Sequence, residues 1–338
     1  MKIWFDITNT PQVHFLLGIR NILQQLGYND FIFTVREFSE TSKLLSQQVD
    51  VSFQTIGGHY GKNMLKKSFG LISRFLQVHQ LPFGYDLSVS CGSESAIWSA
   101  WIKQRKSIAF GDNDTAQQWT YSLFVDFAFF PNAIPKKKLE RQGLKGKLYL
   151  YNGYKEDIYL SFYKPDPNFL LHLPFTNYIV VRPENIQARY TGKRKIKSIV
   201  PNLLKKLCDT GYNVLYLPRY DIDYQYCDGL HGVFIPKQPM NGLDICYHAD
   251  AVLTGAGTLA REAACLGVPA FSFYAGKELL AVDQKMIKEG CMTFSRDPDK
   301  LIQALKRSKR RETNLARSKA VQQEVMEKLK EVLGEMGL

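Results

Sequence analysis

The segment DAVLTGAGTLAREAACLGVPAFSF, residues 250–273, carries the residue types of a phosphate-binding turn. A short apolar run leads into Gly255 and Gly257, which let the backbone turn tightly and approach a ligand. Thr258 then opens a predicted helix, and the amides at a helix N-terminus bind anions. Glu262 follows one turn along, where its carboxylate is placed to accept hydrogen bonds from a sugar hydroxyl. The pattern predicts a nucleotide-phosphate site, with glycines that serve only strand–helix packing as the alternative.

The elements that would position this turn alternate between strands and helices along the chain. In the first half, strands are expected at IWFDI, FIFTV, VSFQTI, DLSVS, SIAF and FAFF. Helical patterns separate them at 13–26, 40–47, 64–80, 95–103 and 115–124. In the second half, strands are expected at 178–181, 213–217, 232–235, 251–253, 270–273 and 292–294, with a helix at 199–209 among the helices between them. This alternation predicts an α/β protein built from parallel sheets with helices on both faces.

A stretch rich in Tyr, Pro and Asp near residues 151–177 predicts a linker between two doubly wound, Rossmann-like domains. The expected division is a first domain at 1–155, a linker at 156–177, a second domain at 178–305 and a charged helical tail at 306–338. Ligands of such sheets bind beyond the carboxyl ends of the strands. Two domains facing a cleft would therefore share one site for two substrates.

Composition and charge favour a cytoplasmic protein with anionic partners. No run of about 18 apolar residues predicts a membrane span, and no signal peptide precedes the first predicted strand. The six cysteines lack metal-ligand spacing, which predicts reduced thiols. The formal net charge of +12 favours phosphorylated substrates or acidic lipid headgroups. We expect no nucleic acid partner and no bound metal, and either a monomer or a homodimer.

Several motifs together resemble the GT-B glycosyltransferase superfamily: FDITNTPQVHF, SCGSESA, FGDN, VVRPE, and GAGTLAREAACLGVPA with GKELLAVD. Among characterised members, the chain resembles the enzyme that adds N-acetylglucosamine to a lipid-linked muramyl peptide, and the non-hydrolysing UDP-N-acetylglucosamine 2-epimerases. Over nearly its full length it is similar to a prokaryotic family, the domain-of-unknown-function 354 group. The resemblance implies a GT-B fold and a metal-independent reaction on a nucleotide-diphosphate sugar, with a UDP-sugar favoured and no other cofactor.

On the donor side, the resemblance places Glu262 against the nucleotide ribose and the 255–258 loop against the diphosphate. Ile235 follows a predicted strand where GT-B enzymes cradle the base. Asp283 lies in the segment that commonly binds donor sugar hydroxyls, and its alternative role is to cap the helix that follows.

Two arginines end predicted strands of the second domain. Arg182 and Arg219 both stand where a guanidinium can reach a diphosphate with two hydrogen bonds. The alternative for Arg182 is a local ion pair with Glu184.

The catalytic base that removes the acceptor proton is expected to be His14 or Asp112. His14 lies on the first turn of the first predicted helix, where a neutral imidazole is a useful base near pH 7. A hydrogen bond to a neighbouring loop is the alternative role for His14. Asp6 and Asp114 are the other carboxylates considered, and Asx-turn chemistry also explains the Asp112–Asp114 cluster.

The acceptor side of the resembled transferase corresponds to loops that follow strands of the first domain. Residues expected on this side are Asn9, Thr10, Ser93 and Asn113. The 8–12 loop departs from the transferase pattern, because bulkier residues replace most of its glycines. A different acceptor is therefore expected.

An apolar stripe at helical spacing predicts an amphipathic helix within Lys62–Gln77. The stripe consists of Met64, Leu65, Phe69, Ile72, Phe75 and Leu76. The opposite side consists of Lys66, Lys67, Arg74 and Gln77. Such a helix could lie on an anionic membrane surface, and the resembled lipid-linked transferase has a membrane-facing patch in this part. The alternative is a helix that covers the sheet.

Three hypotheses of function follow. The first is a glycosyltransferase that moves a sugar from a UDP-sugar to a lipid-linked or cell-surface glycan acceptor, in the cytoplasm or at the inner face of the membrane. The second is a UDP-sugar 2-epimerase that uses Asp112, Asp114 and Glu184, although His231 and His248 are misplaced for it. The third is a non-catalytic nucleotide or polyanion binder.

Overall fold

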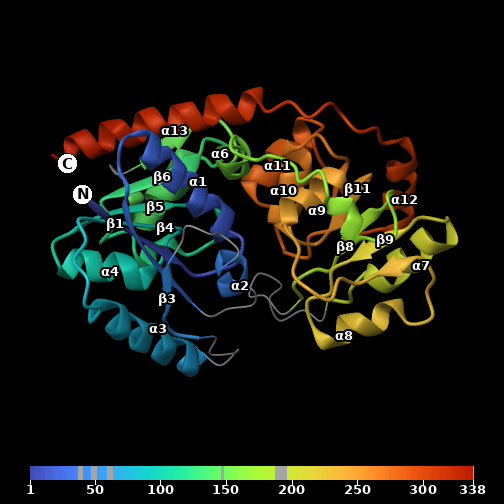
Figure 1. The fold of residues 1–338 in the computed structure, drawn as a ribbon, viewed down its shortest axis with the longest axis horizontal. Coiled ribbons are helices and arrows are strands. Elements are labelled where there is room, and N and C mark those ends of the chain that lie inside the picture. Colours follow the sequence, from blue (N-terminus) through green and yellow to red (C-terminus); the bar gives the residue numbers. More distant parts are fainter. Residues whose placement is uncertain (37–40, 47–51, 59–63, 146–147, 187–195, 338) are drawn as a thin grey trace. The chain divides into compact units, whose positions relative to one another are not determined.

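A computed structural model describes residues 1–36, 41–46, 52–58, 64–145, 148–186 and 196–337, without the side chains of 64–68 (Figure 1). The chain forms two compact units, the first made of residues 1–162 and 316–338 and the second of residues 163–315. The segment 156–162 thus belongs to the first unit, and so does the end of the chain from Ala316 onward.

Seven parallel strands form the sheet of the first unit, in the order β3-β2-β1-β4-β5-β6-β7. They are β1 (Lys2–Ile7), β2 (Asp30–Val35), β3 (Phe53–Thr55), β4 (Leu87–Ser90), β5 (Lys106–Phe110), β6 (Phe127–Pro131) and β7 (Leu148–Tyr151). The six expected strands are confirmed, and β7 is an additional one. The strand order reverses between β1 and β4, so the loops after these strands diverge where ligands of such sheets bind.

Helices cover both faces of this sheet (Figure 1). They are α1 (Gln12–Gln25), α2 (Thr41–Ser46), α3 (Met64–His79), α4 (Glu94–Ile102), α5 (Lys136–Leu139), α6 (Lys155–Leu160) and α13 (Ala316–Glu335). Helices α1, α6 and α13 contact one another, and α3 contacts α4. The backbones approach closely, because a Cβ at Gly18 would lie 2.8 Å from Tyr159 Cβ and one at Gly153 would lie 2.3 Å from Val321 Cγ2. Glycine at both positions lets α6 lie between its neighbours.

The helix expected over 115–124 is wrong. The structure has only a short 3₁₀ helix there, Gln118–Thr120. Asn113 Oδ1 accepts hydrogen bonds from the amides of Thr115 and Ala116 at 2.9 and 3.1 Å. This side-chain turn offers the backbone an alternative to an α-helix.

Six parallel strands form the sheet of the second unit, in the order β10-β9-β8-β11-β12-β13. They are β8 (Ile179–Arg182), β9 (Val214–Tyr216), β10 (Val233–Phe234), β11 (Ala251–Thr254), β12 (Ala270–Ser272) and β13 (Thr293–Phe294). The helices are α7 (Val200–Asp209), α8 (Asp221–Tyr224), α9 (Gly242–His248), α10 (Gly257–Cys265), α11 (Ala281–Lys288) and α12 (Pro298–Arg307). The order reverses between β8 and β11, which places a second switch point there.

The core of the second unit fixes the position of that switch point. Val181 and Leu253, on the neighbouring strands β8 and β11, are fully buried in one cluster with Leu203 and Leu207 of α7. Each unit is therefore a doubly wound, Rossmann-like α/β domain, as the sequence predicts. No helix in the described ranges combines the length and the apolar character that crossing a membrane requires.

Candidate functional site

The loop between β11 and α10 lies at the carboxyl edge of the second sheet, at its switch point. β11 ends at Thr254, whose partner in register on β8 is Arg182. Helix α10 begins at Gly257 behind Ala256, and this N-cap residue supplies no side-chain hydrogen bond to the helix. A helix start without a side-chain cap keeps its first amides available for a ligand or water, which is the arrangement that binds phosphate groups.

Gly255 allows two backbone segments to approach each other at this edge. Its amide donates to the carbonyl of Arg182 at 3.0 Å. A Cβ at position 255 would lie 2.5 Å from Glu184 Cα and 2.7 Å from Glu184 N, which is closer than real atoms approach. Packing alone therefore requires glycine at this position.

Glu262 and Arg182 place opposite charges near this loop. Glu262 is only 6% exposed and lies on α10. The thiol of Cys246 on α9 experiences both charges: burial and Glu262 raise the pKa of Cys246, whereas Arg182 lowers it. A buried carboxylate and a guanidinium beside a helix N-terminus are the groups that hold a sugar hydroxyl and a phosphate.

Arg219 and Ile235 lie beyond the carboxyl ends of β9 and β10. Arg219 Nε donates to the carbonyl of Pro183 at 2.9 Å, and its amide donates to Asp223 Oδ2 at 2.9 Å. Ile235 is half-buried and packs against the core of the second unit. The structure therefore brings both residues to the edge that carries the 255–258 loop, with Arg219 tied to the segment that follows β8.

Glu184 lies within the protein interior rather than on a surface loop. Its side chain is fully buried, with Oε1 3.0 Å from Arg296 Nη2 and Oε2 accepting a hydrogen bond from Ser198 at 2.7 Å. These partners tie the end of β8 to the start of α7 and to the segment after β13. The contacts give Glu184 a structural role.

Asp283 forms an ion pair with a residue that the sequence did not single out. Its Oδ1 lies 3.0 Å from Nη1 of Arg261, and the two side chains are 1% and 4% exposed. Asp283 Oδ2 is buried without a hydrogen-bond partner among the described residues. Asp283 lies in the first turn of α11, but Leu280 is the N-cap residue of that helix.

His14 lies on the first turn of α1, beyond the carboxyl end of β1. The side chain is half-buried, and its ring stacks on Tyr159 of α6 with the centroids 6.2 Å apart. The Tyr159 ring of α6 thus packs against the imidazole at the switch point of the first sheet.

The turn before His14 is closed by its own side chains. The amide and hydroxyl of Thr8 donate to Gln12 Oε1 at 2.8 and 3.1 Å. The carbonyl of Asn9 accepts a hydrogen bond from the Gln12 amide at 3.0 Å, and the hydroxyls of Thr10 and Thr41 lie 2.9 Å apart. Hydrogen bonds thus shape this loop.

Asp112 follows β5 and forms a shielded ion pair with Lys155, the first residue of α6. The Asp112 Oδ2–Lys155 Nζ distance is 2.8 Å, and the side chains are 16% and 9% exposed. The thiol of Cys91, which follows β4, lies in the field of this pair. Burial raises the pKa of Cys91 to about 12, with Lys155 lowering it and Asp112 raising it. Lys155 is thus a polar residue at the carboxyl edge that the sequence pattern did not reveal.

The neighbours of Asp112 have structural partners. Asn113 forms the turn described above, and Asp114 Oδ2 lies 2.6 Å from Lys138 Nζ. No group of three His, Cys, Asp or Glu residues that could hold a metal ion occurs in the described part of the chain.

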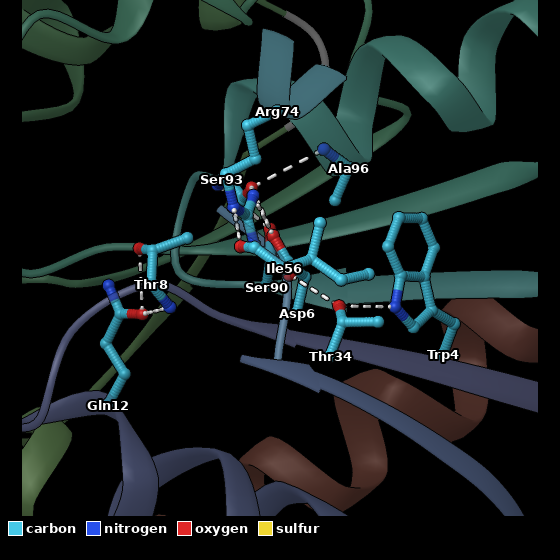
Figure 2. A network of polar contacts seen from close by, with 10 residues as sticks. All are labelled: Trp4, Asp6, Thr8, Gln12, Thr34, Ile56, Arg74, Ser90, Ser93 and Ala96. Carbon is cyan, nitrogen blue, oxygen red and sulfur yellow. Dashed lines mark hydrogen bonds and ion pairs between the residues drawn. The ribbon is translucent and has the colours of Figure 1, made fainter. Parts of the chain in front are cut away.

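Ser93 belongs to a buried network centred on Asp6 (Figure 2). Ser93 Oγ donates to Asp6 Oδ2 at 2.5 Å and accepts from the Ala96 amide at 3.4 Å, so it also caps α4. Arg74 of α3 makes two contacts with the Asp6 carboxylate, at 2.6 and 3.0 Å. Thr34 of β2 donates to the same carboxylate at 2.6 Å. The network joins β1, β2, α3 and α4 at the end of β1.

The network maintains Asp6 as a carboxylate inside the protein. Burial alone would raise the pKa of Asp6, but the charge of Arg74 and the hydrogen bonds from Arg74, Ser93 and Thr34 together hold this pKa below its ordinary value. Arg74 is 4% exposed, so it does not lie on a solvated face. Helix α3 is instead turned so that Phe69, Ile72 and Leu76 are exposed, and Lys62 lies outside the described residues.

Similarity to known proteins extends over the whole chain. The model of the family described as "Protein of unknown function (DUF354)" matches residues 1–336. The uncharacterized protein MJ0665 of Methanocaldococcus jannaschii is 25% identical over 324 residues, which are 89% of this chain and 90% of that protein.

Solved structures share the fold. A UDP-GlcNAc 2-epimerase of M. jannaschii, in complex with UDP-GlcNAc and UDP, has a TM-score of 0.72 at 14% identity, covering 98% of this chain and 99% of its own. The calicheamicin glycosyltransferase CalG4 has a TM-score of 0.57 at 12% identity, covering 98% of each chain. These similarities give the two Rossmann-like units a GT-B fold class, and the chain belongs to the family of proteins of unknown function DUF354.

Proposed function

We propose that this protein is a UDP-sugar-dependent glycosyltransferase whose second unit binds the donor. The observation that carries the proposal is the β11–α10 turn, where a helix without a side-chain cap begins at the switch point with the buried Glu262 on the same helix. In the proposed complex the 255–258 loop and Arg182 hold the diphosphate, and Glu262 accepts hydrogen bonds from the ribose. Ile235 and Arg219 complete the donor side, and Asp283, buried beside Arg261 of α10, supports it from the interior.

The acceptor binds the first unit, at the edge that carries His14 and the Asp112–Lys155 pair. His14 is the proposed base, because an imidazole takes up a proton near neutral pH. Asp112 is the second candidate, with its Oδ2 engaged by Lys155 at 2.8 Å. No metal is assigned a role, because the leaving diphosphate can be stabilised by amides and guanidinium groups.

The environments of the carboxylates favour transfer over 2-epimerisation. Epimerisation needs several groups in one site to remove and return a proton at a sugar carbon. Glu184 is fully buried and paired with Arg296 in the interior, which leaves only Asp112 and Asp114, paired with Lys155 and Lys138, of the three carboxylates considered for that reaction. The ring of His248 in the second unit stacks on Phe169 with the centroids 5.3 Å apart, and its Nε2 lies 3.0 Å from the carbonyl oxygen of Asp166.

We propose further that α3 lies on an anionic membrane surface. Phe69, Ile72 and Leu76, at helical spacing, are 70%, 56% and 48% exposed because Arg74 is turned inward. Exposed apolar side chains on a protein of net charge +12 suit an interface with acidic lipids. The protein would then act at the cytoplasmic face, where lipid-linked acceptors are within reach.

Vesicle binding tests the membrane proposal. The triple variant Phe69→Ser, Ile72→Ser, Leu76→Ser should lose sedimentation with phosphatidylglycerol vesicles, while the wild type sediments with them and not with phosphatidylcholine vesicles. Equal sedimentation of the two proteins would refute this role of α3.

Product analysis tests the reaction. The protein is incubated with UDP-GlcNAc or UDP-glucose, with and without a lipid extract that contains polyprenyl-linked glycans, and nucleotides are separated by chromatography. A transferase releases UDP when the extract is present and forms no second nucleotide sugar without it. An isomeric UDP-sugar formed without extract would establish epimerisation instead, and UDP binding without either product would favour a binding protein.

A further inference from the structure

Arg261 lies in the interior of the second unit, immediately behind the 255–258 loop. It is 3% exposed and belongs to the same helix, α10, that begins at Gly257. Its Nη2 is 3.5 Å from Thr258 Oγ1, and a Cβ at position 257 would lie 2.9 Å from its Nη1. The guanidinium therefore occupies the space beside the first residues of α10. Glycine at position 257 leaves room for the guanidinium.

The partner of Arg261 satisfies only part of its own hydrogen-bonding capacity. Asp283 Oδ1 is 3.0 Å from Arg261 Nη1, but Asp283 Oδ2, in a side chain 1% exposed, has no hydrogen-bond partner among the described residues. A buried carboxylate oxygen without a donor costs free energy. Burying an ion pair also costs desolvation, and apolar residues of similar size often serve stability as well or better. Stability alone is therefore a weak reason for a charged pair at this position.

The position of the pair relative to the loop suggests a different reason. Of the two charged groups, the guanidinium is the one that faces the loop. Its Nη2 lies 3.5 Å from Thr258 Oγ1, and its Nη1 lies 2.9 Å from where a Cβ at position 257 would be. Asp283 offsets part of its charge, but the guanidinium presents the positive end of the pair to the loop, as the helix N-terminus does, and both attract anions. In a site shielded from water, a charge behind the loop acts on a bound anion more strongly than it would in solvent.

We propose that Arg261 is a positioning residue for the donor diphosphate, held by Asp283 behind the 255–258 loop. It orients the loop amides and supplies positive charge through the loop, without needing to touch the nucleotide. The inference rests on the proposed donor site. It attributes the preference of that site for a diphosphate to the interior residues Arg261 and Asp283. The nucleoside part of the ligand does not depend on this pair.

The experiment compares UDP with uridine, so that the contribution of the diphosphate is isolated. Calorimetric titration gives the ratio of the two dissociation constants for wild type, Arg261→Met and Arg261→Lys. We expect Arg261→Met to weaken UDP binding by about tenfold and leave uridine binding unchanged, as for loss of a favourable charge at a helix N-terminus. Arg261→Lys keeps the positive charge and should therefore keep most of the preference for UDP over uridine.

A double variant separates charge from folding. Arg261→Met with Asp283→Leu removes both charges and leaves neither partner buried alone, so it should melt close to the wild type. We expect this double variant to show the same reduced ratio as Arg261→Met. If the folded double variant showed the same ratio of UDP and uridine dissociation constants as the wild type, the inference would be overturned and the pair would be purely structural. A wild-type protein that binds no UDP would overturn the proposed donor site itself, and the inference with it.

Discussion

Replacement of Arg74 by methionine tests how the first unit is held together. In the wild type, Arg74 makes two contacts with the carboxylate of Asp6, which is 0% exposed (Figure 2). In Arg74→Met the carboxylate would keep the hydroxyls of Ser93 and Thr34 as donors among the described residues, and it would still interact electrostatically with Arg36. Removing one partner of a buried ion pair costs about 3–5 kcal/mol, because the remaining charge stays buried without its closest opposite charge.

A matched control comes from an exposed ion pair of the same unit. Arg105 Nη1 lies 3.9 Å from Asp86 Oδ1, with side chains 51% and 40% exposed. Exposed pairs of this kind contribute about 0–1 kcal/mol. Arg105→Met should therefore change the free energy of unfolding far less than Arg74→Met does.

The pH dependence of the Arg74→Met effect has a defined sign. The pKa of Asp6 in the wild type is lower than its ordinary value of 3.8, so its contribution to stability is present above that value and is lost as the pH falls through the lowered pKa. Arg74 supplies the two largest contributions that lower this pKa, so we expect burial to raise the pKa of Asp6 in the variant. The variant is then destabilised most at neutral pH. The difference from wild type should shrink as the pH falls through the acidic range.

Tryptophan fluorescence reports this unfolding selectively. All four tryptophans, Trp4, Trp98, Trp101 and Trp119, belong to the first unit. Urea titrations monitored by this signal, at several pH values, give the free energy of unfolding for the three proteins. A loss below about 1 kcal/mol for Arg74→Met at neutral pH, or a loss that grows on acidification, would show that Arg74 does not stabilise a buried Asp6 carboxylate.

Three further predictions concern the two candidate edges. Gly255→Ala would place a Cβ 2.5 Å from Glu184 Cα, so calorimetry should show the second unit destabilised by about 1–3 kcal/mol, together with weaker UDP binding. Lys155→Met removes the partner of Asp112, which lies 2.8 Å away, and should lower the rate of sugar transfer without changing the affinity for UDP. Lys155→Arg should restore part of that rate. An unchanged transfer rate in Lys155→Met would contradict this role of the pair. Because burial raises the pKa of Cys91 to about 12, alkylation of its thiol by iodoacetamide, followed by mass spectrometry, should be slow at about pH 8 and should accelerate as the pH rises toward that value.

The fold could be predicted because the pattern that specifies it is local. Buried parallel strands appear in a sequence as short apolar runs, and the helices between them show a helical spacing. Twelve strands of the two sheets are therefore predicted from such runs, and the structure contains them. The strand β7 was not expected, because its run LYLY adjoins residues that suggested a linker. Side-chain turns such as that of Asn113 compete with helix formation, and the helix expected at 115–124 was wrong for that reason.

The candidate site was predicted less completely, because its ion pairs join residues far apart in the sequence. Arg74 and Asp6 are separated by 68 positions, and the helical pattern places Arg74 on the side of the helix opposite its apolar stripe. Arg261 and Asp283 are separated by 22 positions, and only the packing of α10 against α11 brings them together. Lys155 and Asp112 are also far apart in the sequence. They meet because the strand order brings the segments after β5 and β7 to the same edge of the sheet. Local motifs revealed the turn at 255–258 but not the interior charges that support it.

The most direct test of the central claim measures whether Glu262 holds a nucleotide ribose. Calorimetric titrations compare UDP with its 2′-deoxy and 3′-deoxy analogues, for wild type, Glu262→Ala and the surface control Glu289→Ala, whose carboxylate is 40% exposed. We expect wild type and Glu289→Ala to bind UDP and to discriminate against at least one deoxy analogue. Glu262→Ala should bind UDP about tenfold more weakly or worse and lose that discrimination. Equal affinity of wild type and Glu262→Ala for UDP, or no binding of UDP by the folded wild type, would contradict the account.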